Sequence, residues 1–131
     1  MSEVPLPEAS PLTEPYWTGL AEGELRHQRC STCGNAWLPA REECPRCLSD
    51  EWTWQPSAGK GRLISWVVYH TAPHASFADR VPYNVAVVEL DEGPRLITNI
   101  LAADEDLAIE HPVVLQIEQE SGVAVPRFRL T

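Results

Sequence analysis

The feature that most constrains this chain is a cluster of four cysteines within eighteen residues. Cys30 and Cys33 form one Cys-x-x-Cys pair, and Cys44 and Cys47 form a second pair after a spacer of ten residues. Each pair can wrap a tight turn so that both sulfurs face one ion. Two such turns supply four thiolates in a tetrahedron, the arrangement that suits Zn²⁺. The spacing therefore predicts a zinc ribbon with all four cysteines as ligands.

Other uses of these cysteines are open but less favoured. Iron redox chemistry is the main alternative, because rubredoxin uses the same ligand set. Four protein ligands close the coordination sphere, so no position remains for a substrate or an activated water, and this favours a structural zinc. A thiol-redox motif would need a βαβ context that the sequence does not show. His27 lies three residues before Cys30 and is interpreted as a strand residue beside the site rather than a fifth ligand.

The charge balance narrows the classes of partner. The 131 residues carry 10 basic and 19 acidic side chains, a net charge of −9. Such a chain repels phosphate backbones, so no nucleic-acid partner is predicted. The apolar stretches are too short to span a bilayer, and residues 1–15 have acids and prolines where a signal peptide needs basic and then apolar residues. We therefore predict a cytoplasmic protein without a membrane partner, in a compartment that keeps thiols reduced.

Three consecutive parts are predicted along the chain: an N-terminal arm and helix over residues 1–23, the zinc ribbon over 24–57, and a C-terminal domain over 58–131. Within the ribbon, short strands are expected at 25–29, 35–39 and 51–55. Alternation places Trp52 and Trp54 on one face of the third strand. This segment has too little apolar material for a core of its own. Metal binding would supply its folding energy, on the order of 10 kcal/mol or more.

A short helix is expected near the N-terminus, after an extended arm over residues 1–12. Thr13 is a potential N-cap, and Gly23 is a potential stop. The helix would place Tyr16, Trp17 and Leu20 on one face. Such an aromatic face needs a cover, and the sequence leaves open whether its own domain or another subunit supplies it.

The C-terminal part has the alternation and the turn residues of a β domain. Strands are expected at 62–71, 83–90, 95–101, 113–119 and 123–130, with a hairpin turn at Asp91-Glu92-Gly93-Pro94. The acidic stretch 102–112 can form a single helical turn between the third and fourth strands. This order predicts a five-stranded OB-type barrel, with a five-stranded sandwich as the alternative. The fold class is therefore mainly β, with one N-terminal helix.

No catalytic residue is predicted. All four thiols belong to the metal site, and the sequence contains no nucleophile elbow, phosphate-binding glycine loop or His-Glu-x-x-His motif. Polar candidates gather around residues 71–82, a segment that is long for a connection between strands. They are His70, His74, Asp79, Arg80 and Tyr83. A histidine there is suited to acid–base chemistry, but we expect no independent catalysis.

Several short motifs, in their order and spacing, resemble one family over nearly the whole chain. They are Tyr16-Trp17-Thr-Gly-Leu20, the four cysteines, Gly61-Arg62-Leu-Ile-Ser65, Ala72-Pro73-His74 with Phe77, Val81-Pro82-Tyr83, Val88-Glu-Leu-Asp-Glu-Gly-Pro-Arg95 and Pro126-Arg127-Phe128. This is the acyl-CoA-associated family, once a domain of unknown function, with an N-terminal helix, a rubredoxin-like zinc ribbon and a C-terminal OB-fold. Leu48 and Glu110 stand where members often have glycine, so we expect local changes in those turns.

The resemblance implies a function by association. Members are similar to small subunits that pair with thiolase-superfamily enzymes, including steroid side-chain retro-aldolases, or with acyl-CoA hydratases. The large subunit carries the catalytic groups, and the small subunit stabilises it and shapes the acyl-CoA site. We therefore expect a zinc-binding accessory subunit of a thiolase-like enzyme, in an α₂β₂ assembly by analogy, that forms or cleaves carbon–carbon bonds of acyl-CoA. The alternatives are a subunit of an acyl-CoA hydratase and a nucleic-acid-binding zinc-ribbon and OB protein.

Aromatic and basic side chains are the candidate contacts with this partner or with acyl-CoA. Five tryptophans are too many for a small core, and tryptophan is enriched at interface hot spots. Residues 26–62 carry a net charge of +2, which leaves −11 for the rest of the chain; four thiolates with Zn²⁺ bring this segment near zero, and the asymmetry is consistent with a ribbon that faces CoA. Trp66 alternates with apolar neighbours and is predicted in the core. The candidate contacts are Trp17, Trp37, Pro39, Arg41, Arg46, His74, Phe77 and Tyr83.

Overall fold

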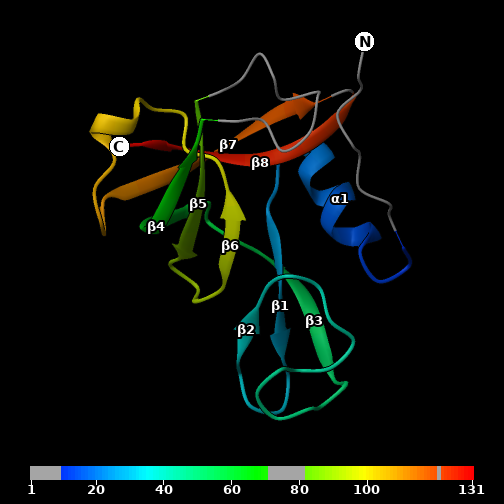
Figure 1. Ribbon diagram of the computed structural model, residues 1–131. Helices are drawn as coiled ribbons and strands as arrows, with labels where there is room; N and C mark the ends of the chain where they lie inside the picture. The colour runs from blue at the N-terminus through cyan, green and yellow to red at the C-terminus, as the bar shows by residue number, and fades with distance from the viewer. Residues whose placement is uncertain (1–9, 71–81, 121) are drawn as a thin grey trace.

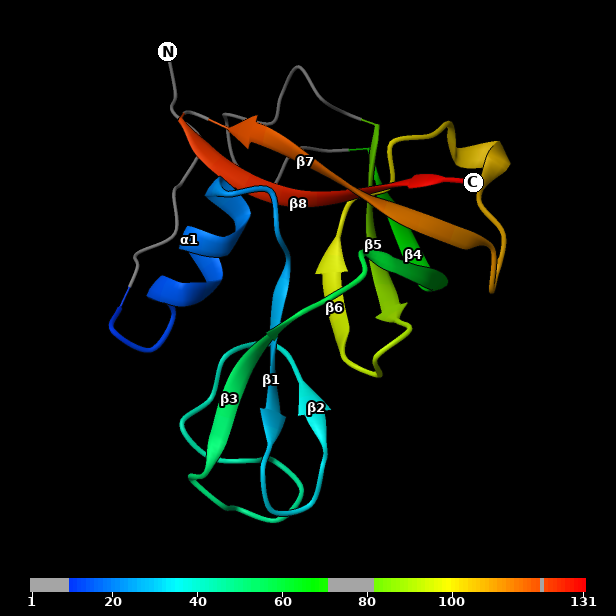
Figure 2. The same cartoon turned by 180° about the vertical axis from the view of Figure 1, so that it is seen from behind.

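The computed structural model describes residues 10–70, 82–120 and 122–131, which fold into one α-helix, eight strands and a single 3₁₀ turn (Figures 1 and 2). In chain order these are α1 (Glu14–Ala21), β1 (Arg26–Cys30), β2 (Ala36–Trp37), β3 (Trp52–Pro56), β4 (Lys60–Tyr69), β5 (Tyr83–Leu90), β6 (Arg95–Thr98), η2 (Asp104–Asp106), β7 (Pro112–Glu120) and β8 (Val123–Leu130). The predicted class, mainly β with one N-terminal helix and a ribbon, is confirmed. Within the described ranges, no helix has the length and apolarity needed to cross a lipid bilayer.

Strands β4 to β8 form a curled antiparallel sheet in the order β6-β5-β4-β7-β8 (Figure 1). A parallel bridge between Ile100 and Phe128 joins the segment after β6 to β8. The Leu101 N–H donates to the Phe128 carbonyl at 2.8 Å, and the Phe128 N–H donates to the Asn99 carbonyl at 3.1 Å. This strand order, with η2 between the third and fourth strands, confirms the predicted OB-type architecture.

Alternation of side chains builds the core of this barrel. In β5, every second residue from Asn84 to Leu90 is buried, as the period of two requires. Phe128, Leu63 and Val88 are fully buried at its centre. Trp66 packs against the same cluster from a half-buried position, which agrees with its predicted place in the core.

Strand β4 needs a glycine where it passes between two neighbours. Gly61 lies opposite Leu90 of β5 on one side and Val113 of β7 on the other. A Cβ atom added to Gly61 would overlap the backbone carbonyl of Glu89. The glycine is therefore required by close approach of the strands, because its backbone leaves no room for a side chain.

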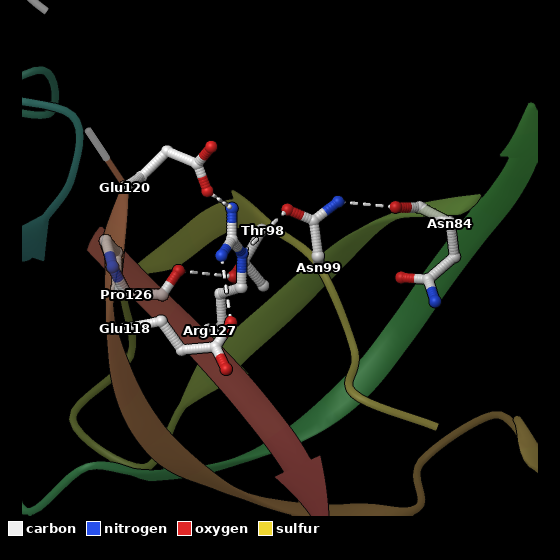
Figure 3. Close-up of polar contacts among 7 residues, drawn as sticks. All are labelled: Asn84, Thr98, Asn99, Glu118, Glu120, Pro126 and Arg127. Atoms are coloured by element: carbon white, nitrogen blue, oxygen red, sulfur yellow. Dashed lines mark hydrogen bonds and ion pairs between the residues drawn. The ribbon is translucent and has the colours of Figure 1, made fainter. Parts of the chain in front are cut away.

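A polar network links the strands that close the barrel (Figure 3). Arg127 of β8 donates to the carboxylates of Glu118 at 2.8 Å and Glu120 at 3.2 Å, both on β7. Arg127 also donates to Asn99 at 3.4 Å, and Asn99 donates to the Asn84 carbonyl of β5. The side chains of Arg127 and Glu120 are 17% and 13% exposed. Because these charges are mostly removed from water, each depends on its partner.

Helix α1 packs against β8 and β1 at the end of the barrel (Figure 2). Leu20 is fully buried in the barrel core, and Tyr16 and Trp17 are half-buried against it, so the protein's own barrel covers part of the aromatic face. Burial raises the pKa of Tyr16 to about 12. The expected side-chain cap is wrong: Thr13 occupies the N-cap with a near-helical backbone, and its hydroxyl accepts the Ser10 N–H at 2.8 Å.

The ribbon is a separate three-stranded sheet in the order β2-β1-β3, and it extends away from the barrel (Figure 1). Gln28 of β1 lies opposite Trp37 of β2 and Trp54 of β3. The Gln28 side chain is fully buried, donates to the Arg41 carbonyl at 2.7 Å and accepts the Arg41 N–H at 2.8 Å. A buried amide thus holds the loop that leads from β2 to the second cysteine pair.

Candidate metal centre and interface

The four cysteine sulfurs converge in the ribbon, as their spacing predicts. All four Sγ atoms lie within 4.8 Å of one another. The Sγ atoms of Cys30 and Cys47 are 3.5 Å apart, and those of Cys33 and Cys44 are 3.6 Å apart. Thiolates bound at about 2.3 Å to one tetrahedral zinc lie roughly 3.8 Å apart. The donor set and its spacing therefore fit a zinc ion with four protein ligands and no open position for a substrate.

Backbone amides of both turns point at the sulfurs. The N–H groups of Thr32 and Cys33 donate to Cys30 Sγ at 3.3 and 3.4 Å. The Arg46 N–H donates to Cys44 Sγ at 3.4 Å. Such bonds stabilise the thiolate form that a metal requires, and they fix the sulfurs on the inside of each turn.

The pKa values of two of the thiols shift in opposite directions within the cluster. Burial raises the pKa of Cys44, but the N–H groups of Cys47 and Arg46 outweigh it and lower the value to about 6. The Ser49 N–H lowers the pKa of Cys47, yet burial and the neighbouring sulfurs raise that value to about 12. One thiol therefore ionises while Cys47 keeps its proton and shares it with the neighbouring sulfurs. A divalent ion would favour the thiolate form of all four.

Residues with left-handed backbone follow both cysteine pairs. Gly34 has φ of +79°, as expected for the first turn, and Leu48 has φ of +65° in the second. Glu110, the other departure from the family pattern, has φ of +64°. Both non-glycine residues thus occupy a backbone region that favours glycine, at a cost of about 1–2 kcal/mol each. The departures from the pattern produce strained turns.

His27 is a buried strand residue and not part of the sulfur cluster, in agreement with its interpretation. It lies opposite Gln55 on β3, and its side chain is fully buried. Neither ring nitrogen has a hydrogen-bond partner among the described residues. Burial lowers the pKa of His27, and the nearby Glu92 carboxylate opposes that effect. His27 is therefore a neutral imidazole that packs in the ribbon without a hydrogen bond to any described residue.

Tryptophans pack around the metal centre, and Trp37, which was predicted as a contact for a partner, is buried among them. Trp37 is 4% exposed and clusters with Cys30 and Cys44, so it is a core residue of the ribbon rather than a surface ring offered to a partner. Trp52 packs against this cluster with its ring centroid 6.3 Å from that of Trp37. Trp52 and Trp54 are 5.9 Å apart on the same face of β3, as predicted. Sequence alternation could not reveal the burial of Trp37, because β2 has only two residues.

A pocket of about 470 Å³ lies where the helix, the ribbon and the barrel meet. Tyr16 and Trp17 of α1 form one wall, residues 38–40 of the ribbon form another, and Val87 with residues 95–97 forms the third. Its volume is within the range of small-molecule and side-chain sites. Trp17 and the ribbon's Pro39, two of the predicted contacts, therefore line one apolar pocket.

The other predicted contacts are dispersed. Arg41 and Arg46 are exposed on the ribbon. Tyr83 begins β5 and stacks on Tyr69 of β4 with a centroid distance of 5.3 Å. The candidates at positions 74 and 77 lie outside the described residues. Sequence reasoning missed Ile97 and its neighbours in β6, although the YNVAVVEL and RLIT stretches carry apolar residues at both phases of the alternation.

The fold and the sulfur cluster together define the class of protein: a zinc ribbon joined to an OB-fold barrel, with an N-terminal helix packed on both. Family models match residues 17–53 as the rubredoxin-like zinc ribbon domain of ChsH2 and residues 54–118 as the C-terminal OB-fold domain of ChsH2. The chain belongs to this ChsH2 family, whose members are also named DUF35 proteins.

Relatives include one solved structure that the chain matches along nearly its full length. It is titled Ltp2-ChsH2(DUF35) aldolase, with 34% identity, a TM-score of 0.83, and coverage of 95% of this chain and 98% of the other. A probable enoyl-CoA hydratase alpha subunit of Thermomonospora curvata is 40% identical over 117 residues, 87% of this chain and 36% of the relative. A DUF35 domain-containing scaffold protein of Methanocaldococcus jannaschii is 38% identical over 74 residues, 56% of this chain and 52% of the relative. The chain thus spans about a third and about half of these two relatives.

Proposed function

We propose that this protein is an accessory subunit of a thiolase-superfamily enzyme that forms or cleaves carbon–carbon bonds of acyl-CoA. The observation that carries the proposal is the match over 98% of the ChsH2 chain in a structure whose title names two proteins, Ltp2 and ChsH2, in one aldolase. The small subunit would stabilise the large one and shape its acyl-CoA site, in a cytoplasmic α₂β₂ assembly.

The architecture supports a role without catalysis. The four sulfurs close their coordination sphere, so the zinc they fit has a structural role and offers no Lewis acid to a substrate. The pocket between the three parts is apolar apart from Thr13 and Arg95. Such a lining orients or encloses a partner group, whereas bond cleavage needs positioned acids, bases or nucleophiles.

A second candidate is a subunit of an acyl-CoA hydratase. The probable enoyl-CoA hydratase alpha subunit that shares 40% identity over 117 residues favours it. The matching region is only 36% of that protein, so the rest of its length supplies parts that this chain does not contain. The two candidates share acyl-CoA chemistry and differ in the large subunit. A nucleic-acid-binding function is not proposed, because the net charge of −9 opposes it.

Co-expression tests the proposal directly. The chain would be produced with thiolase-superfamily subunits of its own organism, and in parallel with hydratase subunits, and each mixture analysed by size-exclusion chromatography with light scattering. We expect a stable two-protein complex with a thiolase-like subunit and cleavage or condensation of an acyl-CoA only when both chains are present. Exclusive assembly with a hydratase subunit would support the second candidate. Acyl-CoA turnover by the isolated chain would overturn the accessory role.

A further inference from the structure

One solvent-facing surface of the barrel is largely apolar across three strands, with the exposed Ser65 opposite Val87 as a polar member. We define this outer face by Val67 and Tyr69 of β4, Tyr83, Val85 and Val87 of β5, and Ile97 of β6. The strand register places them side by side: Val67 opposite Val85, Tyr69 opposite Tyr83, and Val87 opposite Ile97. Ile97 is 75% exposed and Val67 is 56% exposed.

This composition is unusual for the solvent-exposed face of a sheet. An antiparallel sheet with one face on a core normally carries polar residues on the other face. Here the side chains of β5 that point outward, Tyr83, Val85 and Val87, are as apolar as the buried ones that alternate with them. A large apolar patch of this kind on a soluble protein indicates an interaction site.

The outer face continues into the pocket beside α1. Val87 and Ile97 belong to the face and also line the pocket, so the flat surface and the hollow are one apolar region. A charged row borders it, where Glu89 accepts hydrogen bonds from Arg62 at 2.9 Å and from Arg95 at 2.8 Å. Arg95 also lines the pocket. Within the described part of the chain, Arg95 donates only through Nε, which leaves its Nη groups for an acidic group of a partner.

We propose that the outer face and the pocket together form the docking surface for the large subunit, an inference that rests on the proposed function. The partner presents an apolar segment whose side chains fill the pocket and cover the face, with an acidic residue that meets Arg95. A buried anchor in a pocket, surrounded by flat contacts that exclude water, is the arrangement of an interface hot spot.

The geometry favours this occupant over three others. An acyl chain that fills the pocket would leave Val67 and Tyr69 in water, whereas a protein surface covers both regions. A second copy would bring a charge of −9 against another −9, and nucleic acid would meet the same repulsion. A partner protein with an apolar centre covers the whole region, and a single acidic residue at its edge meets the local positive charge of Arg95.

Charge insertion on the outer face tests the inference. Ile97→Glu and Val67→Glu place a carboxylate on two exposed positions, and Ile109→Glu is the matched control, because Ile109 is 61% exposed outside the face and the pocket. Affinity would be measured by titration calorimetry against the large subunit identified by co-expression, with melting temperature and zinc content recorded for each variant. We expect about 100-fold weaker binding for each face variant, the size of a hot-spot loss, and unchanged binding for the control.

The outcomes separate this inference from the proposed function. A wild-type complex that both face variants still form at full affinity overturns the docking surface and leaves the accessory role intact. A wild-type chain that binds no acyl-CoA enzyme subunit overturns both. Equal losses in Ile97→Glu and the Ile109→Glu control show that charge alone weakens binding, which also overturns the assignment. A self-association by analytical ultracentrifugation that Ile97→Glu abolishes would make a second copy the occupant.

Discussion

His27 is expected to make the protein less stable in mild acid. Its imidazole is fully buried, and both ring nitrogens lack partners among the described residues. A buried polar group such as this imidazole costs about 1–3 kcal/mol when it makes no hydrogen bond. Replacement by leucine, which has a similar volume and no polar atoms, should therefore raise the free energy of unfolding by about 1–3 kcal/mol near pH 7.5.

The pH dependence adds a second, independent signature. Burial lowers the pKa of His27 in the folded protein, whereas the unfolded chain has the ordinary value of about 6.5. As the pH falls below 6.5, the unfolded chain takes up a proton that the folded chain excludes, so stability falls by up to about 1.4 kcal/mol per pH unit until the folded-state pKa is reached. The His27→Leu variant should lose that part of the slope.

Urea unfolding followed by tryptophan fluorescence, from pH 8 to pH 5.5 in excess zinc, checks both effects. His70→Leu is the matched control because it removes an exposed imidazole, and its stability should stay within about 0.5 kcal/mol of the wild type. Acid release of zinc affects all three proteins alike, so the comparison isolates His27. A His27→Leu variant that is less stable than the wild type at pH 7.5, or that keeps the full acid slope, would refute the reasoning.

Three further perturbations probe the ribbon and the barrel. Cys44→Ser should release zinc and unfold the ribbon together, because zinc binding supplies on the order of 10 kcal/mol of folding energy. Atomic absorption and limited proteolysis check this prediction. A ribbon that lacks metal but resists the protease would contradict it. Gly61→Ala should cost about 3 kcal/mol in thermal unfolding, since its Cβ would overlap the Glu89 carbonyl, while Gly34→Ala meets open space and should cost only the 1–2 kcal/mol of its positive φ. Arg127→Met should cost about 3 kcal/mol by removing the guanidinium that pairs with the carboxylates of Glu118 and Glu120, and a loss below 1 kcal/mol would show that the network is dispensable.

The parts of the structure that depend on local spacing could be read from the sequence. Cys30, Cys33, Cys44 and Cys47 converge because each pair is a single turn, and this geometry depends on only a few residues. The barrel strands were predictable because each is a run rich in β-branched and apolar residues, although a bulge between Leu63 and Ser65 interrupts the alternation in β4. The predicted turn at residues 91–94 is present, with Gly93 at φ of +114°.

The remaining features depend on register between distant strands. The outer face exists because Val67, Val85, Val87 and Ile97 lie side by side across three strands, and a single sequence does not show which residues will be neighbours. The contact of Arg127 with its carboxylates is likewise set by the pairing of β7 and β8. Local sequence was also insufficient at the start of the helix. Thr13 occupies the N-cap as predicted, but its backbone is near-helical and its hydroxyl accepts the Ser10 N–H instead of capping the helix.

The pocket has walls from the helix, the ribbon and the barrel, so its shape depends on the metal site of the ribbon, although no cysteine lines the pocket. Its ribbon wall, residues 38–40, lies between Trp37, which packs on the cysteines, and Arg41, which the Gln28 amide holds. In a cell short of zinc, the proposed docking pocket would lose its ribbon wall, residues 38–40. Metal supply would in this way set how much of the proposed two-chain complex is assembled, without any change in the amount of either polypeptide.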